Sequence, residues 1–320
     1  MFQLVLVIAL AAEWKPAPLA KPDPPPAGAS FRGVEGEATS LLGKPLMPIE
    51  PPAERLRELE ANLAEAQAAL EADPGSEEAA IWLGRRLAYL GRYREAIGAF
   101  TRGLEHHPRS YRLLRHRGHR FISTRRLDLA LADLSRAAEL CDGAPDEVEP
   151  DGQPNAANTP TSTSHTNIFY HLGLVHYLRG EFNHAADAYR RCMAFAANDD
   201  MRCATAHWLY MSLRRVGRHD EAAAVLDPIH AGMTIIENTG YHRLLLMYKG
   251  ELPVEEVMAG IDPASMDGAA VAYGVANWRW CNGDRERAGE LFRQIVAGKN
   301  WPAFGSIAAE AELARATRAP

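Results

Sequence analysis

The sequence predicts an all-α fold, a solenoid of stacked helical hairpins, because one ladder of residue sizes recurs along the chain. Four times a glycine is followed five residues later by an alanine, and a large apolar residue lies eight residues before that glycine. The four pairs are Gly91/Ala96, Gly180/Ala185, Gly217/Ala222 and Gly283/Ala288. A small residue usually follows the large apolar one, and an aromatic residue or leucine lies nine residues after the glycine. Large and small residues at these fixed positions predict two closely packed helices in each unit.

The spacing of these units identifies a repeat. In the second unit, from Tyr111 to about Leu140, Arg125 takes the place of the glycine, 34 residues after Gly91. Glycine suits a helix end because it enters the left-handed region without strain. A period of 34 residues is that of the tetratricopeptide repeat, and the segment WLGRRLAYLGRYREAIGAFTRGLEHHP, residues 82–108, resembles that family.

The resemblance implies an all-α, right-handed superhelical solenoid of about five to six hairpins, closed by a C-terminal capping helix. One face of that last helix would carry Phe304, Ile307, Ala308 and Ala311. The unit around Gly250 lacks the alanine and is expected to be degenerate. A leucine pattern over residues 56–70 predicts one helix leading into the solenoid, with a short coiled-coil segment as the alternative.

Composition divides the chain into six segments. We expect a possible signal peptide over residues 1–12 and a disordered tether over 13–52, since ten of the 21 prolines lie between 16 and 52. A half repeat and two units follow over 53–140, then an acidic insert over 141–165 that is expected to be disordered. Further units, one of them degenerate, cover 166–300, and the capping helix and tail cover 301–320.

The first segment predicts export. Residues 2–12 are an apolar run, too short for a membrane-spanning helix but fitting a signal-peptide core, with an A-x-A-like cleavage site at 9–11. No basic residues precede the run. We therefore expect a periplasmic or secreted protein without a transmembrane segment, with a cytoplasmic protein as the alternative. The use of arginine in place of lysine fits a GC-rich bacterial genome.

Charge is distributed unevenly over the repeats. Residues 81–126 contain twelve arginines against two acidic residues, whereas residues 141–165 contain five acidic residues and neither lysine nor arginine. A solvated arginine face beside a solvated loop is one interpretation. The other is that the acidic insert folds across the basic repeats and competes there with an anionic ligand.

In tetratricopeptide folds the first helix of each hairpin lines a concave groove, and the resemblance implies the same here. Projecting the register along these helices selects positions that share one face. They are Arg85, Tyr89, Arg112, Arg115, His119, Asn167, Tyr170, Tyr177, His207, Met211, Arg214, Arg215, Tyr248, Tyr273, Asn277 and Trp280.

Such a groove is cationic and aromatic. Arginine binds carboxylates through a planar fork, and tyrosine offers rigid contact area. We therefore expect a non-catalytic scaffold that binds a protein or peptide segment with acidic residues or a free carboxylate. Several of the tyrosines would alternatively pack between hairpins. Binding of nucleic acid or another polyanion through residues 81–126 is the alternative function, disfavoured by the net charge of −6 and the five lysines.

The sequence lacks the motifs of the common enzyme and metal-site classes. It contains no phosphate-binding glycine loop, no G-x-S-x-G, no H-E-x-x-H and no C-x-x-C. His171 and His176 are five residues apart, not the four that place two ligands on one helix face, and His116 and His119 lie among arginines. We expect no enzyme, no cofactor and no metal site.

Overall fold

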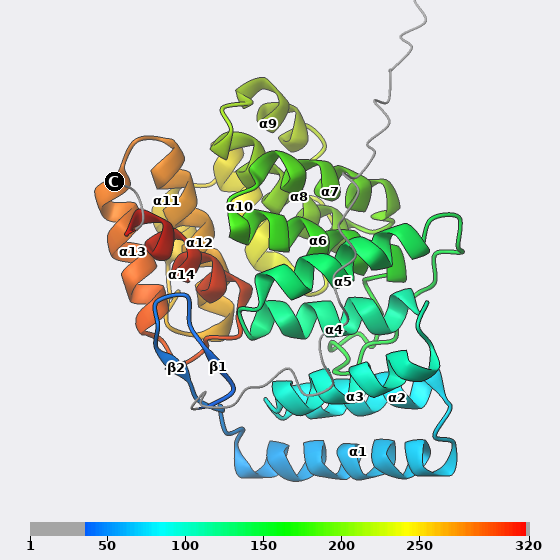
Figure 1. The fold of residues 1–320 in the computed structure, drawn as a ribbon. Coiled ribbons are helices and arrows are strands. Elements are labelled where there is room, and N and C mark those ends of the chain that lie inside the picture. Colours follow the sequence, from blue (N-terminus) through cyan, green and yellow to red (C-terminus); the bar gives the residue numbers. More distant parts are fainter. Residues whose placement is uncertain (1–35, 318–320) are drawn as a thin grey trace, which may run out of the picture. The chain divides into compact units, whose positions relative to one another are not determined.

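The structure, a computed structural model, describes residues 36–317, and within these residues it contains fourteen helices and one two-stranded sheet (Figure 1). The predicted signal peptide and most of the tether lie outside the described residues. The elements are β1 (Ala38–Thr39), β2 (Pro45–Leu46), α1 (Ala53–Ala72), α2 (Glu77–Tyr89), α3 (Tyr93–His106), α4 (Tyr111–Ser123), α5 (Leu127–Leu140), α6 (Ser164–Arg179), α7 (Phe182–Phe195), α8 (Asp199–Arg215), α9 (His219–Leu226), α10 (Thr239–Lys249), α11 (Val254–Met258), α12 (Met266–Cys281), α13 (Arg285–Ala297) and α14 (Phe304–Ala316).

Helices α2 to α13 form six successive hairpins, which confirms the predicted all-α solenoid. Within each hairpin the two helices pack on each other, and the first helices of neighbouring hairpins pack side by side, α2 on α4, α4 on α6, α6 on α8 and α8 on α10. The unit around Gly250 pairs α10 with α11, a helix of five residues, and α12 contacts both α10 and α8. The leucine pattern before the first hairpin becomes α1, which packs on α2.

Every predicted hairpin turn has its key residue in the left-handed region. The φ angles of the five glycines, Gly91, Gly180, Gly217, Gly250 and Gly283, lie between 74° and 90°. Arg125, which takes the glycine place in the second hairpin, has a φ of 62°. A non-glycine residue there is strained, so this arginine needs a compensating interaction, which its ion pair with Glu310 supplies.

The small residues of the ladder allow the two helices of a hairpin to approach closely. Gly84 of α2 lies against the ring of Phe100 of α3, so a Cβ atom at Gly84 would be 2.2 Å from the ring. Gly173 of α6 meets Tyr189 of α7 in the same way, at 2.7 Å. The recurring small and large residues are therefore those that pack against each other inside each hairpin.

Helix α14 is the predicted C-terminal helix, and it is buried on nearly all sides. It packs on α13, α12 and α6, and glycine, serine and alanine make up much of its buried surface. These small side chains make it narrow enough to lie among other helices. Within the described residues, no helix combines the length and apolar character needed to cross a membrane.

The segment before α1 reaches the C-terminal part of the solenoid. Strands β1 and β2 form an antiparallel pair, with Ala38 opposite Leu46. The indole Nε1 of Trp301, before α14, donates to the Met47 carbonyl at 2.7 Å. The Arg94 guanidinium of α3 donates to the Glu37 carbonyl at 3.0 Å. The N-terminal segment thus contacts both the first hairpin and the end of the chain.

The close approach in the first hairpin yields a matched pair of substitutions. Gly84→Ala should lower the free energy of unfolding by about 1–3 kcal/mol, because the added methyl group clashes with Phe100. Gly98→Ala in α3 should raise it by about 0.5–1 kcal/mol, because alanine has the higher helix propensity and the nearest atom there is 3.5 Å away. Urea unfolding of both variants measures the difference, and equal effects would contradict this packing.

Candidate ligand groove

The predicted groove residues fall into three places in the structure. Four of those on α2 and α4 line a cavity beside residues 149–153 of the acidic insert, which we call the insert cavity, and Arg112 and Asn167 lie near it without lining it. A second group, on α6, α8 and α12, lies around the last helix, where Arg215 and Tyr273 contact Glu312 of α14. The remaining ones, on α8 and α10, pack with one another.

The insert cavity has a volume of about 270 Å³ and is lined mainly by first-helix residues of the first two hairpins. Its lining includes Arg85 and Tyr89 of α2 and Arg115, His116, His119 and Arg120 of α4. Residues 149–153 and Ser162 close the other side. Four of the predicted groove residues therefore meet around one space.

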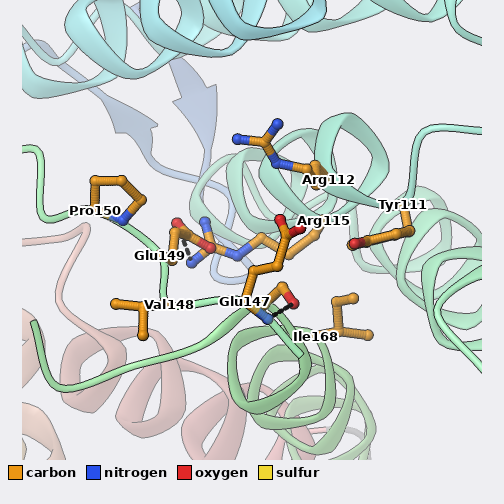
Figure 2. Close-up of a pocket in the computed structure, with 9 residues that line it drawn as sticks. Tyr111, Arg112, Arg115, Glu147, Val148, Glu149, Pro150 and Ile168 are labelled. Atoms are coloured by element: carbon orange, nitrogen blue, oxygen red, sulfur yellow. Dashed lines mark hydrogen bonds and ion pairs between the residues drawn. The ribbon is translucent and has the colours of Figure 1, made fainter. Parts of the chain in front are cut away.

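A carboxylate of the insert enters this cavity. Glu149 lies 3.0 Å from Arg115 and 4.0 Å from Arg85 at the closest nitrogen–oxygen pairs. The Asn167 amide of α6 donates to the second Glu149 oxygen at 3.1 Å. Figure 2 shows Glu149 beside Arg115, in a small adjoining pocket of about 30 Å³ that the insert forms with α4 and α6. The groove residues thus hold an acidic side chain of the same chain.

The backbone of the insert is also held by arginines. Arg85 donates to the Pro150 carbonyl at 2.7 Å, and Arg86 donates to the Gly152 carbonyl at 3.0 Å. Gly152 lies so close to Tyr89 that a Cβ atom there would be 2.0 Å from the tyrosine oxygen. Arg112, by contrast, pairs with Glu78 of α2 at 2.5 Å and not with the insert.

Arg120 differs from the other cavity arginines. Its guanidinium lies over the Tyr93 ring at 5.4 Å, and within the described part of the chain no carboxylate lies within ion-pair distance of it. Burial, assisted by Arg115 and Arg85, lowers the pKa of Arg120 to about 10, which leaves it charged at neutral pH. The cavity therefore contains a cation without an anionic partner.

The histidines of the cavity contribute no charge at neutral pH. Burial, together with neighbouring arginines, lowers the pKa of His116 and His119 well below the ordinary value. His119 instead packs its ring 4.2 Å from that of His171 and 5.3 Å from that of Phe304. The positive charge of the insert cavity comes from its arginines alone.

The second group of groove residues surrounds Glu312 of α14. Arg215 binds this carboxylate through two nitrogens, at 2.8 and 3.0 Å, and the Tyr273 hydroxyl donates to it at 3.2 Å. The Tyr273 hydroxyl also lies 2.8 Å from that of Tyr177, which donates to Asn277 at 3.1 Å. This buried network joins α6, α8, α12 and α14, so these groove positions face the chain's own last helix.

Two aromatic positions extend this second group. Trp280 of α12 lies beneath the Arg215 guanidinium, with 5.5 Å to the ring centroid. Tyr170 of α6 is buried, with its ring 6.3 Å from that of Phe304 in α14 and 5.9 Å from that of Tyr189.

Glu310 of α14 is bound by the strained turn residue. Arg125 lies 2.8 Å from the Glu310 carboxylate, and its guanidinium also donates to the Trp301 carbonyl at 2.8 Å and to the Ser123 carbonyl at 2.6 Å. The backbone N–H of Leu41 donates to the same carboxylate. An arginine in the glycine place thereby connects the second hairpin, the N-terminal segment and α14.

The third group is a buried stack. His207 of α8 lies between the rings of Tyr241 and Tyr248, with centroids 4.7 and 5.9 Å away, and its Nδ1 is 3.2 Å from the Tyr248 hydroxyl. Burial lowers the pKa of His207 to about 3. Arg214 binds the Tyr210 hydroxyl at 2.7 Å, and Met211 is buried. These residues pack between α8, α10 and α12 and line none of the cavity described above.

Several residues of the site were missed in the sequence. Arg120 lies one residue beyond the predicted groove position His119, and periodicity alone does not show that it lines the cavity. Glu310 and Glu312 carried a usable signal, since they are the acidic residues of a helix otherwise rich in alanine. An acidic pair in such a narrow helix suggests buried ion pairs with arginine.

Comparison with known proteins yields structural likeness alone. No family model and no curated protein matches the chain. Among solved structures, MamA is 18% identical, with 55% of this chain and 92% of that chain covered and a TM-score of 0.41. YrrB, described as a tetratricopeptide protein with an unusual peptide-binding site, is 16% identical, with 72% and 91% covered and a TM-score of 0.40. A tetratricopeptide protein from Parabacteroides merdae is 15% identical, with 81% and 94% covered and a TM-score of 0.47.

The hairpins themselves decide the fold. Gly91 and Arg125, 34 residues apart, both adopt the left-handed conformation between paired helices, and the first helices of successive hairpins pack side by side. The chain has a tetratricopeptide-repeat-like fold. In this tetratricopeptide-like solenoid, α14 occupies one part of the predicted groove and the acidic insert borders another.

The Glu312 network makes a prediction about stability. Glu312→Gln should lower the free energy of unfolding by about 3 kcal/mol, because it leaves the largely buried Arg215, and with it Arg315, without a counterion. Glu290→Gln, on the exposed face of α13, should change it by less than about 0.5 kcal/mol. Urea unfolding provides the measurement.

A double variant tests the same network from the other side. Replacing both Arg215 and Glu312 by methionine should cost less than Glu312→Gln, since the one arginine then left without Glu312 is the more exposed Arg315. If Glu312→Gln behaves like Glu290→Gln, the ion pair does not hold α14 in place.

Proposed function

We propose that this protein is a non-catalytic interaction scaffold that binds a carboxylate-bearing segment of a partner protein in the insert cavity. The observation that carries the proposal is Arg120, which lines the cavity together with Arg115 and whose guanidinium has no carboxylate partner among the described residues. An unpaired cation in a half-buried position is costly unless a ligand neutralises it. A carboxylate is the anion that the same cavity already accepts, from Glu149.

The cavity is large enough for one side chain or chain terminus of a ligand but not for a whole peptide. A volume of about 270 Å³ accommodates a side chain or a chain terminus. Tyr89 and Phe100 add aromatic surface beside the arginines, and such rigid side chains are typical anchors at binding sites. We therefore propose that an aspartate or glutamate side chain, or a C-terminal carboxylate, enters the cavity while the rest of the segment lies outside.

Several arginines of residues 81–126 are already paired with carboxylates, which disfavours binding of nucleic acid. Arg117 pairs with Asp133, Arg125 with Glu310 and Arg112 with Glu78, all within 2.8 Å. Phosphate binding depends on cations that are free to neutralise the backbone. Much of the charge of residues 81–126 is already neutralised inside the molecule.

The acidic insert is part of the proposed mechanism. Glu149 holds the carboxylate position beside Arg115, so an incoming carboxylate would compete with it or bind next to it at Arg120. We propose that the insert limits the affinity of the cavity. Location outside the cytoplasm also belongs to the proposal and is supported by the apolar run of residues 2–12.

Substitution of Arg120 tests the site directly. The probe is the strongest binder from an array of acidic ten-residue peptides, each made with a free and an amidated C-terminus, and affinity is measured by fluorescence anisotropy. Arg120→Ala should weaken binding at least tenfold, because truncating one partner of a buried charge pair is costly. Arg109→Ala, in an exposed loop of the same basic segment, should change it less than twofold. Equal effects of the two variants, or no peptide bound, would overturn the proposal.

A second pair of variants tests the role of the insert. Glu149→Gln should tighten binding of the same peptide several-fold at low salt, because Arg115 loses its internal carboxylate. Glu147→Gln removes an equal charge from an exposed side chain two residues away and serves as the control. If Glu149→Gln leaves affinity unchanged or lowers it, the insert does not compete.

A further inference from the structure

The turn between α6 and α7 brings together two histidines and a glutamate. His176 lies in the last turn of α6, Glu181 follows the turn residue Gly180, and His184 lies in the first turn of α7. The candidate ligand atoms of the three side chains all lie within 4.8 Å of one another. We propose that these three residues bind a divalent transition-metal ion of the zinc class.

The distances suit such an ion with small side-chain adjustments. Zinc–ligand bonds of about 2.0–2.2 Å place tetrahedral ligands about 3.4 Å apart. His176 Nδ1 is already 2.7 Å from a Glu181 carboxylate oxygen, and the rings of His176 and His184 have centroids 5.3 Å apart. His184 is exposed, so its ring is free to rotate toward the other two ligands.

Metal binding would displace one hydrogen bond at the site. His176 Nδ1 lies 2.7 Å from a Glu181 carboxylate oxygen, and an ion between them would replace the proton of that contact. His176 and His184 would then bind as neutral imidazoles and Glu181 as a carboxylate, which are the forms of these groups that bind metal.

Arg179 supports the carboxylate without taking the ligand position. Its Nε donates to one Glu181 oxygen at 2.8 Å, while the other oxygen faces His176. Arg179 also pairs with Asp128 of α5, which offsets its charge. An outer hydrogen bond of this kind orients a metal-binding carboxylate.

The donor set selects the class of metal. Two imidazoles and one carboxylate suit zinc, nickel or copper, and not calcium or magnesium, which prefer oxygen ligands alone. Three protein ligands leave a fourth position for water. Because the ligands come from both sides of the turn, a bound ion would link α6 to α7.

Metal titration of the full chain tests the inference. With zinc chloride as the probe, isothermal titration calorimetry should find one site in which His184→Ala or Glu181→Gln lowers affinity at least tenfold, since loss of an outer partner alone costs about that much. His219→Ala, at an exposed histidine beside the next hairpin turn, should leave affinity unchanged.

A second readout is thermal unfolding. Zinc should raise the unfolding temperature of the wild type and of His219→Ala, and not that of His184→Ala, since an ion that binds the folded state stabilises it. Cobalt absorption in the same variants reports the ligand set. If the wild type binds no zinc, or if His184→Ala and Glu181→Gln bind it as tightly as the wild type, the site does not exist.

Discussion

The rest of the structure depends on the neutralisation of two carboxylates buried on α14. Burial of a charge costs several kcal/mol unless it is paired and hydrogen-bonded. The Glu310 and Glu312 side chains are 4% and 3% exposed, and Arg125 and Arg215 each bind one of them. These arginines belong to the second and fourth hairpins, so the last helix is attached to distant parts of the solenoid. The strained φ of Arg125 is compensated by this interaction, which a glycine at that place would lack.

The position of α14 determines where a ligand has room. Its contacts with α6, α8 and α12 occupy the part of the groove that contains Arg215, Tyr273 and Asn277. Space for a ligand is found at the insert cavity between the first two hairpins and residues 149–153. The same chemistry, arginine with carboxylate and tyrosine, therefore serves the fold at one end of the groove and a proposed ligand at the other.

The fold was predictable from the sequence because its signal is local. Each hairpin needs a left-handed residue at the turn and small residues where two helices touch, and both appear at fixed spacing. The surroundings of the groove residues could not be predicted from such local spacing. Whether Tyr177 faces solvent or a buried polar network depends on α12 and α14, about a hundred residues or more further along the chain. The His176, Glu181 and His184 group was missed for a related reason, since its ligands cross a turn and share no helical spacing.

Helix α14 and the acidic insert both place carboxylates beside arginines, but different interactions hold the two segments in place. Helix α14 buries Ile307, Ala308 and Ala311 as well as its carboxylates, so apolar burial and ion pairing act together. The insert is held mainly by polar contacts: hydrogen bonds to its backbone, Glu149, the Asp146–His165 and Thr161–Glu237 contacts, and an isolated bridge between Val148 and Thr163. The Glu149 side chain is 15% exposed, against 3% for Glu312. Under the proposed function, an external carboxylate would have to displace Glu149 alone, whereas replacing Glu312 would require moving a packed helix.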